Sequence, residues 1–147
     1  MKKLIFETSD TLSPLLLRVL LGSVIFAHGA QKLFGWFGGY GFNGTMSYFT
    51  ETVGLPWIVG FGIILLETFG ALALVAGIAT RLLALGFTLL AMGIILTVHI
   101  QYGFYMNWEG SQGGEGIEFF LLWIAISLGL MISGGGRLSV DRKILAA

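Results

Sequence analysis

The chain has 147 residues, of which 56% are hydrophobic and only 11% are charged, whereas a soluble domain typically carries about 25% charged residues. Together with a mean hydropathy of +0.89, this composition excludes a water-soluble fold, and we expect a single domain over residues 1–147 that lies mostly inside a lipid bilayer. Eight basic and eight acidic residues cancel, so the charge predicts no nucleic-acid partner, and the lack of cysteine excludes disulfides, thiolate metal sites and dithiol chemistry carried by the chain itself.

Four apolar runs approach the length that a helix needs to cross a bilayer, which is about 20 residues. The first, Leu12 to Phe34, follows a basic start as a signal peptide does, but it is too long and ends without a good cleavage site. The other three are Trp57 to Gly77, Leu82 to Tyr102 and Ile117 to Ser133. The sequence therefore predicts an all-α membrane protein built as a bundle of four transmembrane helices.

The orientation of these helices follows from their basic residues. One side of the predicted bundle carries Lys2, Lys3, Arg81, Arg137, Arg142 and Lys143. Only Lys32 lies near the other side. Because cytoplasmic loops are enriched in lysine and arginine, we expect both termini and the turn at Arg81 to be cytoplasmic.

The two longer connections then face outward, and both are rich in glycine and aromatic residues. Phe34 to Phe42 alternates the two types, which is typical of an interfacial aromatic belt. Beyond it, Met46, Phe49 and Val53 share one face of a possible short helix along the membrane surface, which Pro56 would end. We expect this connection and the second one, Gly103 to Gly116, to fold back over the bundle.

Chemistry should involve the ionisable side chains inside the spans, because each is costly in hydrocarbon and normally faces the protein interior. The candidates are Arg18, His28, Lys32, Glu67, His99 and Glu118. Glu67 lies roughly 15 Å deep, counted along the second helix. It shares a face with Gly70 and Ala71, as in helices that pack closely against a neighbour. Arg18 and Glu67 are candidates for a buried ion pair that only fixes helix packing, and Lys32 for extension toward the lipid headgroups.

Four of these residues, His28, Lys32, His99 and Glu118, fall in the outer third of the bundle and predict a polar pocket that opens outward. His28 alone could instead bind a backbone carbonyl. His28, His99 and Glu118 could also form a metal site inside the bundle, but no metal-binding pair occurs on a single helix, so we expect no metal. The sequence contains no phosphate-binding loop, nucleophile elbow or flavin fingerprint.

Several short motifs, taken together, resemble the DoxX family of small bacterial membrane proteins over nearly the whole chain. They are Arg18 within Leu-Arg-Val-Leu-Leu-Gly, the run from His28 to Gly35, Glu67 followed by Gly70, the turn Gly77 to Arg81, His99, Glu118, and the closing Gly136 to Asp141. The resemblance implies a compact four-helix bundle in the bacterial plasma (inner) membrane. The family takes its name from a subunit of a thiosulfate:quinone oxidoreductase, and other members are linked to membrane complexes that handle oxidative and thiol stress.

On this basis we expect a membrane subunit that holds a quinone or a similar molecule in the outward pocket. His28, His99 and Glu118 would bond or protonate its oxygens, Lys32 would stabilise negative charge, and Glu67 would relay protons. Trp36 and Tyr102 would help to bind the ring. Expected partners are the lipid bilayer and other subunits or a second copy. The alternatives are a non-enzymatic assembly subunit and a small proton-coupled transporter, although no inverted halves or broken helices support transport.

Overall fold

The computed structural model describes residues 5–146, and all regular structure in this part of the chain is helical. The α-helices are α2 (Ser13–Phe34), α3 (Gly41–Ser47), α4 (Trp57–Leu65), α5 (Ala71–Ala76), α6 (Thr80–Ile94), α7 (Glu118–Ser133) and α8 (Val140–Ala146). Wider π-helical turns are η2 (Tyr48–Thr52), η3 (Leu66–Gly70) and η4 (Ile95–His99), and tighter 3₁₀ turns are η1 (Trp36–Gly38) and η5 (Ile100–Tyr102). The π-helical turns η3 and η4 join their neighbours into longer continuous rods.

Three helical segments in residues 5–146 are long and apolar enough to cross a bilayer, namely Ser13–Phe34, Trp57–Ala76 and Thr80–Tyr102. They match the first three predicted spans within a few residues. The fourth apolar helix, α7, has 16 residues, which rise about 24 Å at 1.5 Å per residue. The chain is therefore an all-helical membrane protein with several candidate spans.

Proline and glycine set the ends of these helices. Pro14 occupies the first turn of α2, where its missing N–H costs nothing, and Pro56 precedes α4. The chain leaves α2 at Gly35 and α5 at Gly77, with φ values of 73° and 71°. Both values are left-handed, a conformation that glycine adopts without the steric cost of a Cβ atom.

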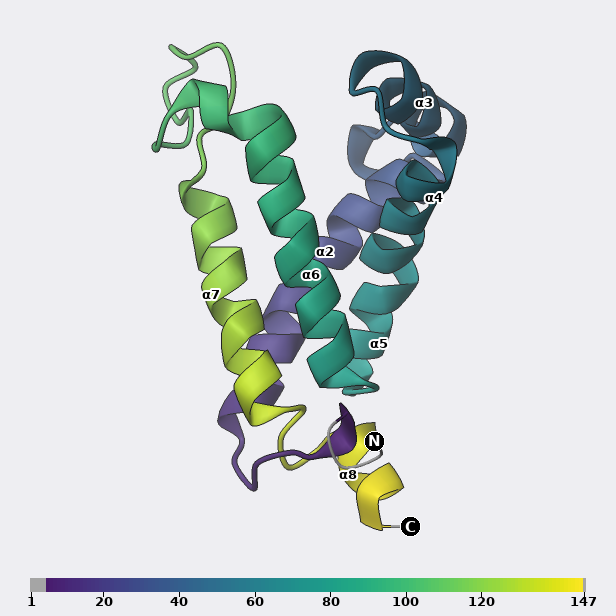
Figure 1. The fold of residues 1–147 in the computed structure, drawn as a ribbon, viewed down its shortest axis with the longest axis vertical. Helices are drawn as coiled ribbons and strands as arrows, with labels where there is room; N and C mark the ends of the chain where they lie inside the picture. The colour runs from purple at the N-terminus through teal and green to yellow at the C-terminus, as the bar shows by residue number, and fades with distance from the viewer. Residues whose placement is uncertain (1–4, 147) are drawn as a thin grey trace.

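The helices form two arms that diverge from a common base (Figure 1). In one arm α6 and α7 lie side by side, and in the other α4, η3 and α5 form one rod with α3 at its tip. Helix α2 crosses obliquely behind both arms and contacts α5, η3, α3 and α7. We call the base, where the described part of the chain begins and ends, the terminal end, and the opposite end, which holds the connections 35–56 and 103–117, the splayed end.

Two clusters of packed apolar side chains stabilise the two arms. The larger lies between α2, α5, α6 and α7; its fully buried members include Ile25, Leu74, Phe87 and Leu130. The smaller lies in the connection 35–56, where Met46 and Phe49 are buried against Ile64 of α4 and Val53 packs at the edge. The predicted apolar face of the short helix is thus confirmed, and it packs on the bundle.

Hydrogen bonds from the Arg18 side chain to backbone oxygens attach the C-terminal segment, residues 134–146, to the rest of the terminal end. Arg18 is 2% exposed and donates to three backbone oxygens, those of Val75, Gly135 (3.0 Å) and Leu138 (2.8 Å). The end of α5 and the segment 135–138 therefore meet on one guanidinium, whose planar fork offers five donors. We call this set of contacts the Arg18 clamp.

Asp141 joins the same segment to the start of α6. Its two carboxylate oxygens accept the N–H groups of Ala79 (2.6 Å) and Thr80 (2.8 Å). Ala79 has a φ of 48°, which is unfavourable for a residue with a side chain. The carboxylate stabilises this turn in the way that an N-cap residue stabilises a helix start.

A surface pair also links the two terminal segments. Arg142 donates to the Asp10 carboxylate, and this hydrogen bond holds the pKa of Asp10 below its ordinary value. A carboxyl group with a lowered pKa stabilises the folded state at neutral pH and stops doing so once acid protonates it. Both groups are exposed, so the contribution is small.

Candidate functional site

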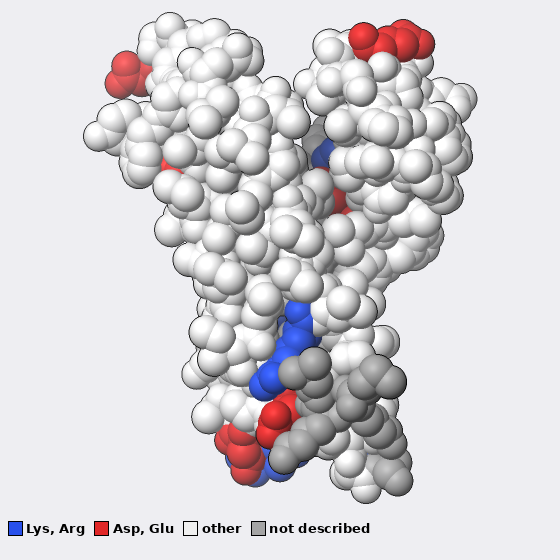
Figure 2. Space-filling model, in the orientation of Figure 1, with Lys and Arg blue, Asp and Glu red and all other residues white. Residues whose placement is uncertain are grey.

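A cleft of about 790 Å³ lies between the two arms. Most of its walls are apolar, and they come from α2, η2, α4, η3, α6, η4 and α7. Figure 2 shows the notch between the arms at the splayed end, with basic and acidic atoms visible deep inside it. The cleft is thus a largely apolar space with few charged groups.

The charged groups at the bottom of the cleft are an ion pair. Lys32 Nζ lies 2.6 Å from Glu67 Oε2, and the two side chains are 24% and 2% exposed. The pair forms because α2 crosses η3 at very short range: a Cβ atom placed on Gly29 would lie 2.5 Å from the carbonyl oxygen of Glu67. Only glycine permits this crossing, which brings Lys32, one turn further along α2, above the carboxylate.

This pair corrects two expectations. Lys32 does not extend toward the headgroups but turns inward to Glu67. Arg18 and Glu67 do not form the predicted ion pair, because Arg18 binds carbonyl groups at the terminal end. Arg18 and Lys32 are 14 residues apart on α2, about 21 Å along the axis, so one carboxylate does not reach both.

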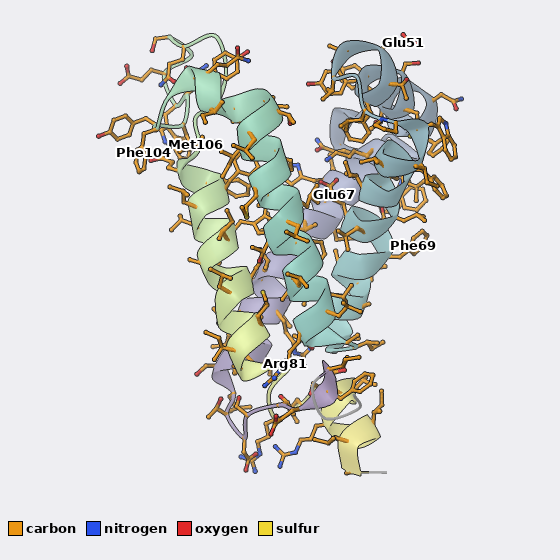
Figure 3. The ribbon with its side chains drawn as sticks, in the orientation of Figure 1. Glu51, Glu67, Phe69, Arg81, Phe104 and Met106 are labelled. Carbon is orange, nitrogen blue, oxygen red and sulfur yellow. The ribbon has the colours of Figure 1, made fainter. Side chains whose placement is uncertain are left out.

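Glu67 and His99 both lie in π-helical turns. Glu67 belongs to η3 and His99 ends η4. Such turns insert one residue into a helix and are frequent at functional sites, where they redirect a side chain. Figure 3 shows Glu67 between α6 and the α4–α5 rod, whereas Phe69, two residues later, points away from the bundle.

The two histidines lie on different walls of the cleft. His28 comes from α2, one turn before Lys32, and lines the cleft on the same side as the ion pair. His99 comes from the opposite arm, with its ring 4.6 Å from that of Phe120. Its Nδ1 lies 2.7 Å from the carbonyl oxygen of Glu115. An Nδ1–H donor fits this contact and leaves Nε2 as the acceptor.

Three predicted site residues are not among those that line the cleft. Glu118 accepts instead the N–H of Met106 (3.0 Å) and Nε1–H of Trp108 (3.4 Å), so it holds the connection 103–117 in place. Trp36 is 52% exposed and its ring lies 5.1 Å from that of Phe34. Tyr102 packs against Gly113 and Gly114. Glu118 and Tyr102 were placed by regular helical spacing and Trp36 by its position in the aromatic connection, and neither argument fixes the direction of a side chain at the end of a helix or in a loop.

Sequence reasoning also missed cleft residues. Gly62, Gly86 and Gly93 line the cleft. The sequence held a signal for two of them, because Gly86 and Gly93 are seven residues apart and so share one face of α6. The spacing of Glu118 and Leu122 predicted that both lie on the inward face of α7, but Leu122 is 67% exposed, and Phe120 and Trp123 are buried in its place. The described residues contain no group of three or more His, Cys, Asp or Glu side chains that could hold a metal ion, so His28, His99 and Glu118 do not meet as ligands.

Comparison with known proteins gives the family. The family model described as DoxX matches residues 13–100. This chain belongs to the DoxX family. A relative from Bacillus subtilis (strain 168), named "Putative oxidoreductase CatD", is 31% identical over 133 residues, which cover 90% of this DoxX protein and 87% of the relative. No solved structure matches this chain.

The motifs that carried the resemblance occupy two places in this DoxX protein. Around the cleft lie His28, Lys32, Glu67 and His99. At the terminal end lie the Arg18 clamp, the turn from Gly77 to Arg81 and the segment from Gly136 to Asp141. The first group can carry ligand chemistry, and the second group holds the base of the two arms together.

Proposed function

We propose that this DoxX protein is a membrane subunit of a quinone-linked oxidoreductase or oxidative-stress complex and that its cleft binds a quinone-like molecule. One observation carries the proposal: a buried Lys32–Glu67 ion pair, together with two histidines, faces a largely apolar cleft. Ion pairs that only join helices do not need an adjoining cavity. The name of the Bacillus subtilis relative supports an oxidoreductase role.

A quinone fits the chemistry of this cleft. Its flat ring is apolar, and its two carbonyl oxygens gain protons when it is reduced to the hydroquinone. The Lys32 ammonium is positioned to stabilise negative charge on one oxygen, and Glu67, in contact with it, is the group that exchanges protons. His28 and His99 offer further hydrogen bonds from the two walls. Ligand pockets commonly span about 300–1,000 Å³, and this cleft lies within that range.

Electrons for the reaction come from outside the chain. It contains no cysteine, so it builds neither an iron–sulfur site nor a dithiol of its own. We therefore place electron transfer in a partner subunit or a redox group bound beside the quinone. The role of this chain is to bind the quinone from the membrane, orient its ring and handle the protons.

We further propose that the chain crosses the bacterial plasma membrane four times and that both termini are cytoplasmic. Arg81, Arg137, Arg142 and Lys143 gather near the terminal end, and blue basic atoms appear there in Figure 2. Lys2 and Lys3, which the same prediction used, lie outside the described residues. In this orientation the splayed end and the mouth of the cleft face outward.

Cysteine labelling tests this topology, because the natural chain has no cysteine. We expect Ser111→Cys, in the exposed connection 103–117, to react with a membrane-impermeant maleimide in intact spheroplasts. Ala146→Cys, exposed at the terminal end, should react only after the membrane is opened. Labelling of both residues in intact spheroplasts, or of Ala146→Cys alone, would show that the proposed orientation is wrong.

Native mass spectrometry of the protein extracted gently from its own membrane tests the quinone site. We expect co-purified quinone in the wild type and its loss by about twofold to tenfold in His28→Ala, since this change removes one hydrogen bond in the cleft, worth about 0.5–1.5 kcal/mol. His28 is not part of the buried core, so the unfolding temperature should stay near that of the wild type. The matched control is Gln101→Ala, an exposed polar residue that does not line the cleft.

An assembly subunit without its own ligand is the second candidate. It is favoured by the exposed aromatic side chains at the splayed end, where Tyr40, Trp108 and Phe37 are 88%, 86% and 71% exposed. Such residues sit equally well in the membrane interface. A stable protein partner in the same mass spectra, with no quinone in any sample, would favour assembly over quinone chemistry.

A further inference from the structure

Glycines widen the cleft at two places along its walls. A Cβ atom built on Gly62 of α4 or on Gly93 of α6 would meet no atom within 4 Å, although both residues line the cleft. The glycines at helix crossings behave differently: a Cβ on Gly22 or Gly29 would lie 2.6 Å or 2.5 Å from its neighbour. Gly62 and Gly93 therefore serve no helix contact in this chain, and their effect is to leave space.

The open space extends along the helices. On α6 and its continuation η4, the cleft is lined at Gly86, Leu90, Gly93, Thr97 and further residues of the same face, as far as His99. A Cβ atom built on Gly86 would lie 3.5 Å from Leu66, so the cleft is narrower at Gly86 than at Gly93. Thirteen residues separate Gly86 from His99, which is about 20 Å along a helix. This length is several times that of one aromatic ring.

Polar and apolar groups are separated within the cleft. Lys32, Glu67 and His28 lie together on the wall formed by α2 and η3. The strip beside Gly62 and Gly93 is apolar, and Val59 and Leu89 belong to it. An amphiphilic ligand matches this arrangement, with a polar head at the ion pair and an apolar chain on the strip between α4 and α6.

The strip continues to the outer surface of the bundle. Val59 and Leu89 line the cleft and are still 44% and 59% exposed. Helix α2 lies behind the two arms, whereas the gap between α4 and α6 faces the viewer in Figures 1 and 2. In a multi-pass membrane protein such a side opening meets lipid, so a hydrophobic molecule reaches it without leaving the bilayer.

From these observations we infer that the cleft takes a lipid-soluble ligand with a long polyprenyl chain, which enters sideways between α4 and α6 and packs its chain against Gly62 and Gly93. The inference rests on the proposed function and adds to it the class of quinone. The polyprenyl chain gains little free energy on moving from lipid into the cleft, because lipid is as apolar as the cleft. Recognition of the polyprenyl chain therefore depends on the shape of the strip, and side-chain volume added at Gly62 or Gly93 should weaken it.

Gly93→Leu tests the inference. The protein is studied in lipid nanodiscs with two probes, a 1,4-benzoquinone with a single prenyl group and its long-chain polyprenyl homologue. Binding is followed by quenching of tryptophan fluorescence in a Trp36→Phe/Trp57→Phe/Trp108→Phe background, which leaves Trp123 of the cleft as the fluorophore. We expect Gly93→Leu to weaken binding of the long-chain quinone by about tenfold, as overfilling a packed space does. Binding of the single-prenyl quinone should change by less than about twofold, because this probe lacks the long chain that is proposed to pack against Gly93.

Two further variants sharpen this test. Gly62→Leu adds the same volume on the opposite wall and should reproduce the selective loss. Ala125→Leu is the matched control, because Ala125 is exposed on α7 away from the cleft, and it should bind both quinones as the wild type does. A Cβ atom at position 93 would meet no atom within 4 Å, and leucine favours the helix over glycine, so Gly93→Leu is expected to fold.

The outcomes separate the inference from the proposed function. If the wild type binds neither quinone, the proposed function is wrong, and the inference with it. If both quinones bind but Gly93→Leu weakens them equally or not at all, the polyprenyl inference is wrong and the proposed function stands. If Gly93→Leu instead converts a dimer into a monomer in native mass spectra, the strip is occupied by a second copy of the chain, which also overturns the inference.

Discussion

Arg18→Leu is expected to destabilise the protein by about 3–5 kcal/mol, because three backbone carbonyl groups lose a charged hydrogen-bond donor. Arg18 binds the carbonyl groups of Val75, Gly135 and Leu138, and an unsatisfied buried carbonyl costs about 1–3 kcal/mol. The measurement is unfolding by a denaturing detergent in mixed micelles or bicelles, followed by circular dichroism.

Two comparisons show whether the Arg18 clamp causes the loss. Arg18→Lys should recover only part of the stability, because one ammonium does not reproduce the planar fork that spans three carbonyl groups. Arg137→Leu is the control: this side chain is 63% exposed and its ion pair with Asp10 is long, at 3.9 Å, so we expect a change within about 0.5 kcal/mol. An Arg18→Leu protein that unfolds like Arg137→Leu would contradict the role of the clamp.

The helices were predictable from the sequence because the bilayer imposes a simple rule on them. Backbone groups in hydrocarbon must bond within their own segment, so a long apolar run is a helix, and proline or glycine at its ends sets its bounds. The first three predicted spans therefore match the observed helices closely. The inward direction of Glu67 was predictable as well, since small residues accompany it on one face.

The partners of the charged residues were not predictable in the same way. Pairing depends on where helices cross, and α2 crosses η3 at Gly29, a position that no hydropathy pattern reveals. The π-helical turns η3 and η4 add a further rotation that a regular helical period does not include. This is why Arg18 was a candidate for pairing with Glu67 and why Glu118 was placed in the pocket. For Glu118 the depth was correct and the direction was not, whereas Arg18 is buried as expected but lies about 21 Å along α2 from Lys32, the residue that pairs with Glu67.

Lys32→Met is the second change with a large expected effect, and its physical basis differs from that of the clamp. It leaves the Glu67 carboxylate, 1% exposed, without its counter-charge. Removal of one partner from a buried ion pair typically costs about 3–5 kcal/mol, whereas replacement of both by neutral groups is often without cost. We therefore expect Lys32→Met to be strongly destabilised in the same unfolding assay and Lys32→Met/Glu67→Gln to recover most of the loss.

Glu67→Gln alone should impair function or assembly far more than Glu51→Gln. Glu51 is an exposed carboxylate at the tip of the splayed end in Figure 3 and is not among the residues that line the cleft, so it controls for the loss of one negative charge. Equal behaviour of the two variants in expression, quinone retention and activity would remove Glu67 from the site.

The double variant then distinguishes a structural ion pair from a functional one. If Lys32→Met/Glu67→Gln regains both stability and quinone binding, the pair serves only to join α2 to η3. If it regains stability but retains no quinone, the two charges are kept for the ligand, because the helices pack without them. The position of the pair favours the second result: its carboxylate is buried, yet both residues line the cleft between the arms.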